Sequence, residues 1–173
     1  MLMLEVFALL LLPGVQAACS ITPDASGHVD IPEGTTSIAG SSFTQCAALI
    51  SISFPSSLQI IEDSEDRHPS GAFSESGLTA ADFSGTSLAY IGRAAFMTAY
   101  ALGSVIFPST LKAIGSSAFA QMGGPAGIDF DFSNTALTII PGAAFYDNGR
   151  LASVRFPSTL QRIEADAFSY RRL

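Results

Sequence analysis

Residues 107–119 read FPSTLKAIGSSAF, and residues 156–168 repeat the same pattern as FPSTLQRIEADAF. Both segments place a Leu four residues after the first Phe, an Ile three residues later and a second Phe five residues after that Ile. Related copies begin at Ile31, Phe54, Phe83, Phe107, Phe132 and Phe156. The steps between these starts are 23, 29, 24, 25 and 24 residues, which indicates an internal repeat of about 24 residues.

Phenylalanine marks two positions of this repeat. Eleven of the 13 phenylalanines occupy the first or the last position of the pattern, which chance placement would not produce. One copy is longer, because the part that contains the run EDSEDRHP at 62–69 has seven extra residues between Ile61 and Phe73. A large aromatic side chain at a fixed position of every copy predicts one buried stack. Its expected members are Phe43, Phe73, Phe96, Phe119, Phe145 and Phe168.

A short segment before each new copy alternates apolar and polar residues, as in Leu102-x-x-Val105-x-Phe107. Alternation with a period of two predicts β-strands, and the proline that follows many of these segments ends the pairing. A unit of about 24 residues cannot bury its own apolar side, so the copies must stack as a solenoid with parallel strands in one sheet. Tight turns and short helical or irregular segments are expected on the opposite side. The strands are expected at about 50–54, 79–83, 103–107, 128–132 and 152–156.

The pattern F-P-x-x-L-x-x-I-x-x-x-A-F followed by L-x-x-[VI]-x-F resembles the BspA-like class of leucine-rich repeats over residues 31–173. The resemblance implies a repeat solenoid of the leucine-rich-repeat type, wound as a right-handed coil. It also implies a surface protein that adheres to or recognises a partner. Cys46 lies where that family often carries a cysteine.

The N-terminal residues predict a leader. The first 12 residues are almost wholly apolar, Pro13-Gly14 ends the run, and small residues lead up to Ala17. We therefore expect a signal peptide at 1–17, an N-terminal edge segment at 18–30 and about six repeats at 31–173. No apolar run reaches the roughly 20 residues of a spanning helix, so no stable membrane span is expected. These features predict a secreted or cell-surface protein.

The charge and the cysteine content limit which partners and which kinds of site the sequence can be expected to have. Eight basic residues against fifteen acidic ones give a net charge of −7, the opposite of what nucleic-acid binding requires. No cofactor is expected. In an oxidising compartment, Cys19 and Cys46 could form a disulfide, and a free, buried Cys46 is an equally good interpretation. Neither cysteine has the spacing of a metal ligand.

Nothing in the sequence predicts an enzyme or a metal site. The two histidines, His28 and His68, have no recurrent acid nearby, and the serines of F-P-S-T-L are interpreted as turn residues. The acidic run at 62–66 lacks the spacing of a calcium loop and is interpreted as a solvated loop. Asp129 and Asp131, two residues apart, are expected on the exposed side of a strand.

The outward positions of the strands are the candidate binding residues. If the first Phe of each repeat points inward, these positions form one ladder-like face. The candidates on it are Ser53, Asp82, Ile106, Asp129, Asp131 and Arg155. We expect a non-catalytic interaction or adhesion module with a protein or glycan partner. The alternative is a structural spacer, or a fragment of a longer repeat surface protein, with no ligand of its own.

The C-terminal copy has no following strand to cover it. It runs from Phe156 to Phe168 and is followed only by Ser-Tyr-Arg-Arg-Leu. An uncovered edge strand offers unpaired backbone groups to another chain. We therefore expect self-association through this edge, or a longer array of which the chain is a part.

Overall fold

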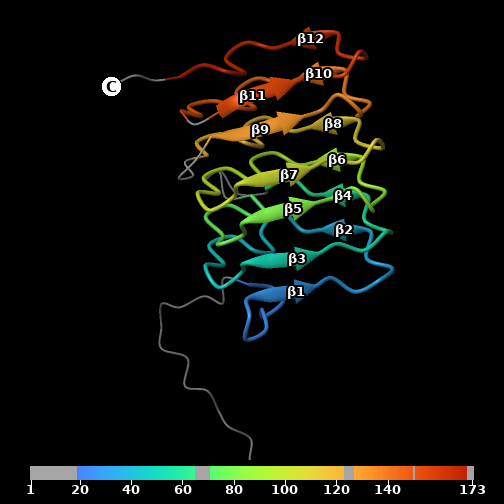
Figure 1. The fold of residues 1–173 in the computed structure, drawn as a ribbon, viewed down its shortest axis with the longest axis vertical. Helices are drawn as coiled ribbons and strands as arrows, with labels where there is room; N and C mark the ends of the chain where they lie inside the picture. Colours follow the sequence, from blue (N-terminus) through green and yellow to red (C-terminus); the bar gives the residue numbers. More distant parts are fainter. Residues whose placement is uncertain (1–18, 65–70, 123–126, 150, 171–173) are drawn as a thin grey trace, which may run out of the picture.

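The chain winds into a solenoid with two columns of short parallel strands (Figure 1). The computed structural model describes residues 19–64, 71–122, 127–149 and 151–170. The first column holds β1 (His28–Asp30), β3 (Ser51–Ser53), β5 (Ala80–Asp82), β7 (Ser104–Ile106), β9 (Ile128–Asp131) and β11 (Leu151–Arg155). The second column holds β2 (Ser37–Ile38), β4 (Ile60–Ile61), β6 (Tyr90–Ile91), β8 (Ala113–Ile114), β10 (Ile139–Ile140) and β12 (Arg162–Ile163). Within these ranges no helix is long and apolar enough to cross a membrane.

The first column confirms the strands that the alternating segments predict. β1 pairs with β3, β5 with β7 and β9 with β11, all in parallel, with Val29 opposite Ile52 and Ala81 opposite Val105. Backbone bonding therefore divides the column into three pairs rather than the single continuous sheet expected. The coil between β3 and β5 is the one lengthened by the insertion at 62–69. β1 precedes the first predicted repeat and adds a strand to the column.

The second column is a feature that the alternation does not predict. Its inward residue is the Ile of each L-x-x-I segment, which is buried in every described coil except the last, and Ile61 lies opposite Ile91 in parallel register. β2, β4, β6 and β8 form one sheet, and β10 pairs with β12. The stretches between this Ile and the second Phe contain turns and no helix among the described residues, so the expected tight turns and irregular segments are confirmed and the helical alternative is not.

Turns with left-handed residues close the third side of each coil. Ala94 and Thr98, two residues before and after Phe96, have φ of 57° and 55°. Such a conformation stops helix propagation, because the helix needs negative φ at every residue. The N–H groups of Phe96 and Thr98 instead donate to the carbonyls of Ala118 and Ala120 in the next coil, at 2.8 and 3.0 Å. Backbone hydrogen bonds thus join the coil of β5 and β6 to the coil of β7 and β8 on all three sides.

The second Phe of each repeat forms the predicted stack inside the solenoid. From Phe73 through Phe96 and Phe119 to Phe145, successive ring centroids are 5.0, 5.4 and 5.6 Å apart, with interplanar angles of 9°, 3° and 11°. These four rings are buried. Phe168 stacks on Phe145 at 5.0 Å but is 36% exposed, so its predicted burial is wrong. The reason is positional, because no described coil covers its outer face.

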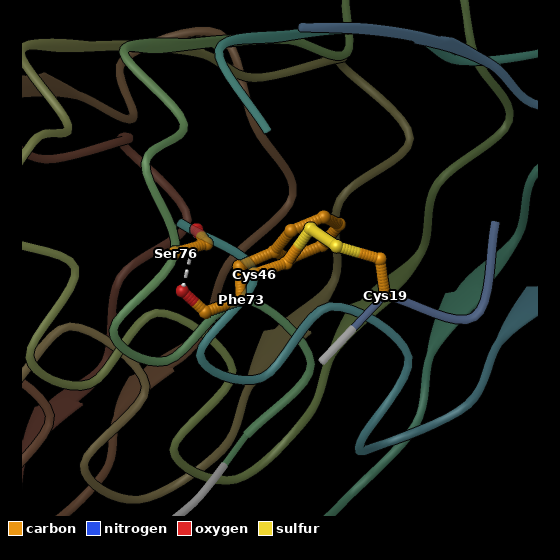
Figure 2. Close-up of a disulfide and its surroundings, with 4 residues drawn as sticks. All are labelled: Cys19, Cys46, Phe73 and Ser76. Carbon is orange, nitrogen blue, oxygen red and sulfur yellow. Dashed lines mark hydrogen bonds between the residues drawn. A yellow bond between two sulfur atoms is a disulfide. The ribbon is translucent and has the colours of Figure 1, made fainter. Parts of the chain in front are cut away.

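A disulfide lies at the N-terminal end of the stack. Cys19 is bonded to Cys46, which lies three residues after Phe43, and Figure 2 shows this bridge beside Phe73 and Ser76. The equivalent residue of the next coil is Ser76, whose hydroxyl donates to the carbonyl of Phe73 at 2.9 Å. Of the two alternatives that the sequence leaves open, the structure shows the disulfide. The bridge ties the N-terminal segment to the first coil, where Phe43 is buried.

Replacing a central ring of the stack should destabilise the whole solenoid. Phe119→Ala is expected to lower the free energy of unfolding by about 3–5 kcal/mol, because removal of the buried ring leaves a cavity between two coils. Phe168→Ala is the matched control at the exposed end, with an expected loss of about 1–2 kcal/mol. Urea unfolding followed by circular dichroism would measure both. Equal losses of unfolding free energy at the two positions would contradict the conclusion that the stack is the main element of the core.

Reduction of the disulfide should also lower stability. The bridge closes a loop with a sequence separation of 27 residues. In the chain-entropy account, a loop of this size contributes about 3–4 kcal/mol by restricting the unfolded chain. We expect that loss when a reductant is added during urea unfolding, and no further effect of reductant on a Cys19→Ala variant. Superimposable curves for the parent protein with and without reductant would contradict a bonded pair.

Candidate interaction face

The outward side chains of the first column form one exposed surface, here called the sheet face. Burial alternates along each strand, as in β5, where Ala81 is buried between the exposed Ala80 and Asp82. Within each bonded strand pair the outward residues lie opposite each other in register, and the three pairs follow one another along one side of the solenoid (Figure 1). The sheet face comprises His28, Asp30, Ser51, Ser53, Ala80, Asp82, Ser104, Ile106, Asp129, Asp131, Ser153 and Arg155.

The structure places every predicted site residue on this face, at an exposed position. These residues are Ser53, Asp82, Ile106, Asp129, Asp131 and Arg155. Asp82 lies opposite Ile106, and Asp131 lies opposite Arg155. Ile106 is the one large apolar side chain of the sheet face and is 52% exposed. The face therefore combines small polar groups and carboxylates with a single central apolar side chain.

Lateral pairs connect β9 and β11 on the sheet face. A guanidinium N–H of Arg155 donates to the Asp131 carboxylate at 3.4 Å, and the hydroxyl of Ser153 donates to Asp129. Asp131 also accepts a hydrogen bond from the backbone N–H of Ser133 at 2.9 Å. Hydrogen bonding from Ser133, followed by the positive charge of Arg155, holds the pKa of Asp131 below its ordinary value. This carboxylate is therefore ionised at neutral pH.

At the N-terminal end of the sheet face, β1 and β3 form a polar cluster. Nδ1 of His28 lies 2.7 Å from the hydroxyl of Ser51, and Nε2 lies 3.1 Å from both Asp30 Oδ1 and the hydroxyl of Ser53. Hydrogen bonding from His28 and then from Ser53 lowers the pKa of Asp30. Considering only recurrent acids in the sequence does not place Asp30 beside His28. Residues two apart on a strand share a face, and this brings Asp30 beside the ring.

A serine, a histidine and an aspartate in contact are components of a nucleophilic site, but such a site also needs free backbone N–H groups beside the serine. The N–H groups of Ile50 and Ser51 both donate to the Gly27 carbonyl, at 2.8 and 3.2 Å. They are therefore not available to stabilise a negative oxygen. The cluster joins two neighbouring strands through side-chain hydrogen bonds.

The acidic run of the insertion provides a contact between coils. Asp63 Oδ1 accepts hydrogen bonds from the hydroxyl of Tyr90 and from the backbone N–H of Arg93, both at 2.6 Å. Burial, together with the contact to Asp63, raises the pKa of Tyr90. Residues 65–70, which include His68 and the last two residues of the predicted solvated loop at 62–66, lie outside the described part of the chain. Among the described residues, no three His, Cys, Asp or Glu side chains are grouped so that they could hold a metal ion.

Sequence reasoning missed His28 and Asp30 as members of the face. The segment before the first repeat carries none of the template residues, so its strand had no pattern to predict it. The one available signal was His-Val-Asp itself, in which a single apolar residue stands between two polar ones. Three residues are too few to establish a period of two.

The comparison with protein families agrees with this architecture. The family model described as BspA type leucine rich repeat region matches six copies, over residues 24–124 and 66–173. No curated protein matches the sequence. A leucine-rich repeat protein from Bacteroides ovatus ATCC 8483 is similar among solved structures, at 20% identity and a TM-score of 0.41. The match covers 83% of this chain and 46% of that one, so the chain spans less than half the length of that protein. Because the family model covers nearly all of the repeat region, the chain belongs to the BspA-type leucine-rich repeat family.

Proposed function

We propose that the chain is a non-catalytic, extracellular interaction module that binds a protein partner through the sheet face. The observation that carries the proposal is that the outward side chains of six stacked strands share one face, with the register set by backbone pairing within each of the three strand pairs. Repeat solenoids of this kind offer extended surfaces of the type that suits another macromolecule. Proteins of this family typically serve as interaction or surface repeats.

The chemistry of the face favours a partner with basic groups around an apolar pocket. Four aspartates stand on it, and Arg155 is its single cationic side chain besides the titratable His28. Asp131 neutralises Arg155. Ile106, opposite Asp82, provides apolar area at the centre, where interfaces concentrate binding energy. Complementary charge around such a centre speeds association and orients the partner.

Substitution of the central apolar residue tests this proposal. We expect Ile106→Arg to weaken binding about tenfold, since an anchor is lost and a charge enters the contact. Ile60→Arg is the matched control, because Ile60 is also an exposed strand isoleucine, at 40%, but belongs to the second column. Binding would be measured by surface plasmon resonance against the hits of an array of purified matrix proteins and glycans. The control should bind like the parent protein.

Each other result of this array has a defined meaning. Binding to glycans alone would replace the protein partner by a carbohydrate one. Binding to no element of the array would favour the structural spacer. Equal losses for Ile106→Arg and Ile60→Arg would show that the sheet face is not the binding surface.

Secretion is a separate part of the proposal and rests on the apolar N-terminal residues and the disulfide. The bond between Cys19 and Cys46 suits an oxidising compartment. When the chain is expressed with its own N-terminus in a secreting cell, we expect the protein in the medium to begin at Ala18. Edman sequencing would check this, and Ala17→Arg should abolish cleavage at that bond. Secreted protein that begins at Met1 would contradict a cleaved leader.

We also propose that the chain self-associates through its C-terminal end. Ile163 and Tyr170 are 47% and 58% exposed in the last described coil. Within the described residues, β11 pairs only with β9, and β12 only with β10. An exposed apolar surface between two unpaired strand edges favours contact with another chain.

A further inference from the structure

We infer that Asp82 of β5 and Ile106 of β7 form a binding site for an arginine side chain of the partner, with the guanidinium on the Asp82 carboxylate and the aliphatic stem on Ile106. This inference rests on the proposed function of the sheet face and names the chemistry that the partner must present at its centre. The evidence is an internal counterpart of the same site, which the next bonded strand pair, β9 and β11, fills with its own Arg155.

The two strand pairs have the same backbone arrangement around one outward aspartate. Asp82 lies opposite Ile106, and Asp131 lies opposite Arg155, both in parallel register. In each pair, the residue after the aspartate donates its backbone N–H to the carbonyl of the opposite residue, at 2.9 Å in the first pair and 2.8 Å in the second. The two aspartates therefore occupy equivalent places on the sheet face.

The turn after each strand also holds the two carboxylates in the same way. Both aspartates begin the sequence Asp-Phe-Ser. Oδ1 of Asp82 accepts the backbone N–H of Ser84, and Oδ1 of Asp131 accepts the backbone N–H of Ser133, both at 2.9 Å. These bonds orient the carboxylates and leave Oδ2 of each one for another donor.

The two sites differ in the residue on the opposite strand. A guanidinium N–H of Arg155 donates to Oδ2 of Asp131 at 3.4 Å, whereas Ile106 offers Asp82 no donor. The third aspartate at this position, Asp30, has the Nε2 atom of His28 at 3.1 Å. Among the described residues, no basic side chain forms an ion pair with Asp82. Asp82 is thus the member of this group that is left for a cation from outside.

The surroundings of Asp82 suit an arginine better than a lysine. Arginine lays its methylene groups along apolar surface while its charged end stays on a polar group, and the exposed Ile106 provides that surface beside the carboxylate. The planar guanidinium is also less strongly hydrated than an ammonium group and offers several N–H donors to a carboxylate. The other outward residues of the pair, Ala80 and Ser104, are small and exposed, so they leave room for the incoming side chain.

The same ion pair gains strength when a partner covers it. In water, an exposed pair such as Arg155 with Asp131 contributes little to stability, because solvent screens the two charges. A partner that covers Asp82 and Ile106 displaces this water, buries apolar area and lowers the local dielectric constant. Arginine is enriched among the residues that dominate interface energies for this reason.

A phage-displayed library of random linear peptides, selected on the purified full chain, tests the site. We expect the selected peptides to be enriched in arginine over lysine. D82N should lower their affinity about tenfold in surface plasmon resonance, because the amide keeps the oxygen that accepts the Ser84 N–H and removes the charge. Replacing the arginine of a peptide by lysine should also weaken its binding, and D82N should then have little further effect.

Matched variants separate this site from the net charge of the protein. E62Q removes the same charge from an exposed residue next to the second column, and it should bind the peptides like the parent protein. R155A should open the internal counterpart at Asp131. In NMR titrations with a selected peptide, the amide of Ser84 should shift in the parent protein, and the amide of Ser133 should shift in addition in R155A. Melting temperatures would show that each variant is folded.

The outcomes distinguish this site from the proposed function. Peptides without a preference for arginine, or with an affinity that D82N leaves unchanged, would overturn the arginine site. If those peptides still lose affinity with Ile106→Arg, the sheet face remains the binding surface. A Ser133 amide that does not shift in R155A would overturn the equivalence on which the inference rests. A library that yields no binder would also overturn the arginine site, while the array of matrix proteins and glycans would still decide the proposed function.

Discussion

The stack of phenylalanines is the interaction on which the rest of this structure depends. Within its own coil, a ring such as Phe96 has only an edge contact with Phe83, and its two faces are covered by Phe73 and Phe119 of the neighbouring coils. Each coil is therefore stable only as a neighbour of other coils. The left-handed residues on either side of the ring, Ala94 and Thr98, fix the turn that points it inward and direct its backbone bonds to the next coil.

This constraint leaves the outer face of the first column free to vary. The inward residues of each strand must be apolar, while the outward ones need only be compatible with a strand. On the sheet face these residues pair across coils, as Arg155 does with Asp131 and His28 with Ser51. Neighbouring repeats are thus coupled through charges and hydroxyls as well as through the core. A partner that binds this face would contact several coils at once, and its affinity would depend on their register.

The sequence was sufficient for the core and the first column because both recur with a fixed spacing. The second column could not be predicted, since each of its strands has two residues and shows no alternation. The disulfide between Cys19 and Cys46 remained one of two alternatives until the structure joined two segments 27 residues apart. The contact of His28 with Ser51 depends in the same way on the register between coils. The exposure of Phe168 was missed because the repeat pattern is identical in inner and terminal coils.

The two ends of a solenoid built from equal coils fit each other unless something modifies them. Here the N-terminal end is modified by the disulfide and by Asp24, which satisfies the first backbone groups of β1. The C-terminal end keeps the apolar surface of an inner coil, exposed at Ile163. The net charge of −7 is unevenly distributed along the sequence, since residues 150–173 hold five of the eight basic residues and two of the fifteen acidic ones. In the described part of this segment, however, Arg155 and Arg162 are each paired with a carboxylate of the same chain. The exposed apolar surface, rather than a net charge, therefore distinguishes this end from the inner coils.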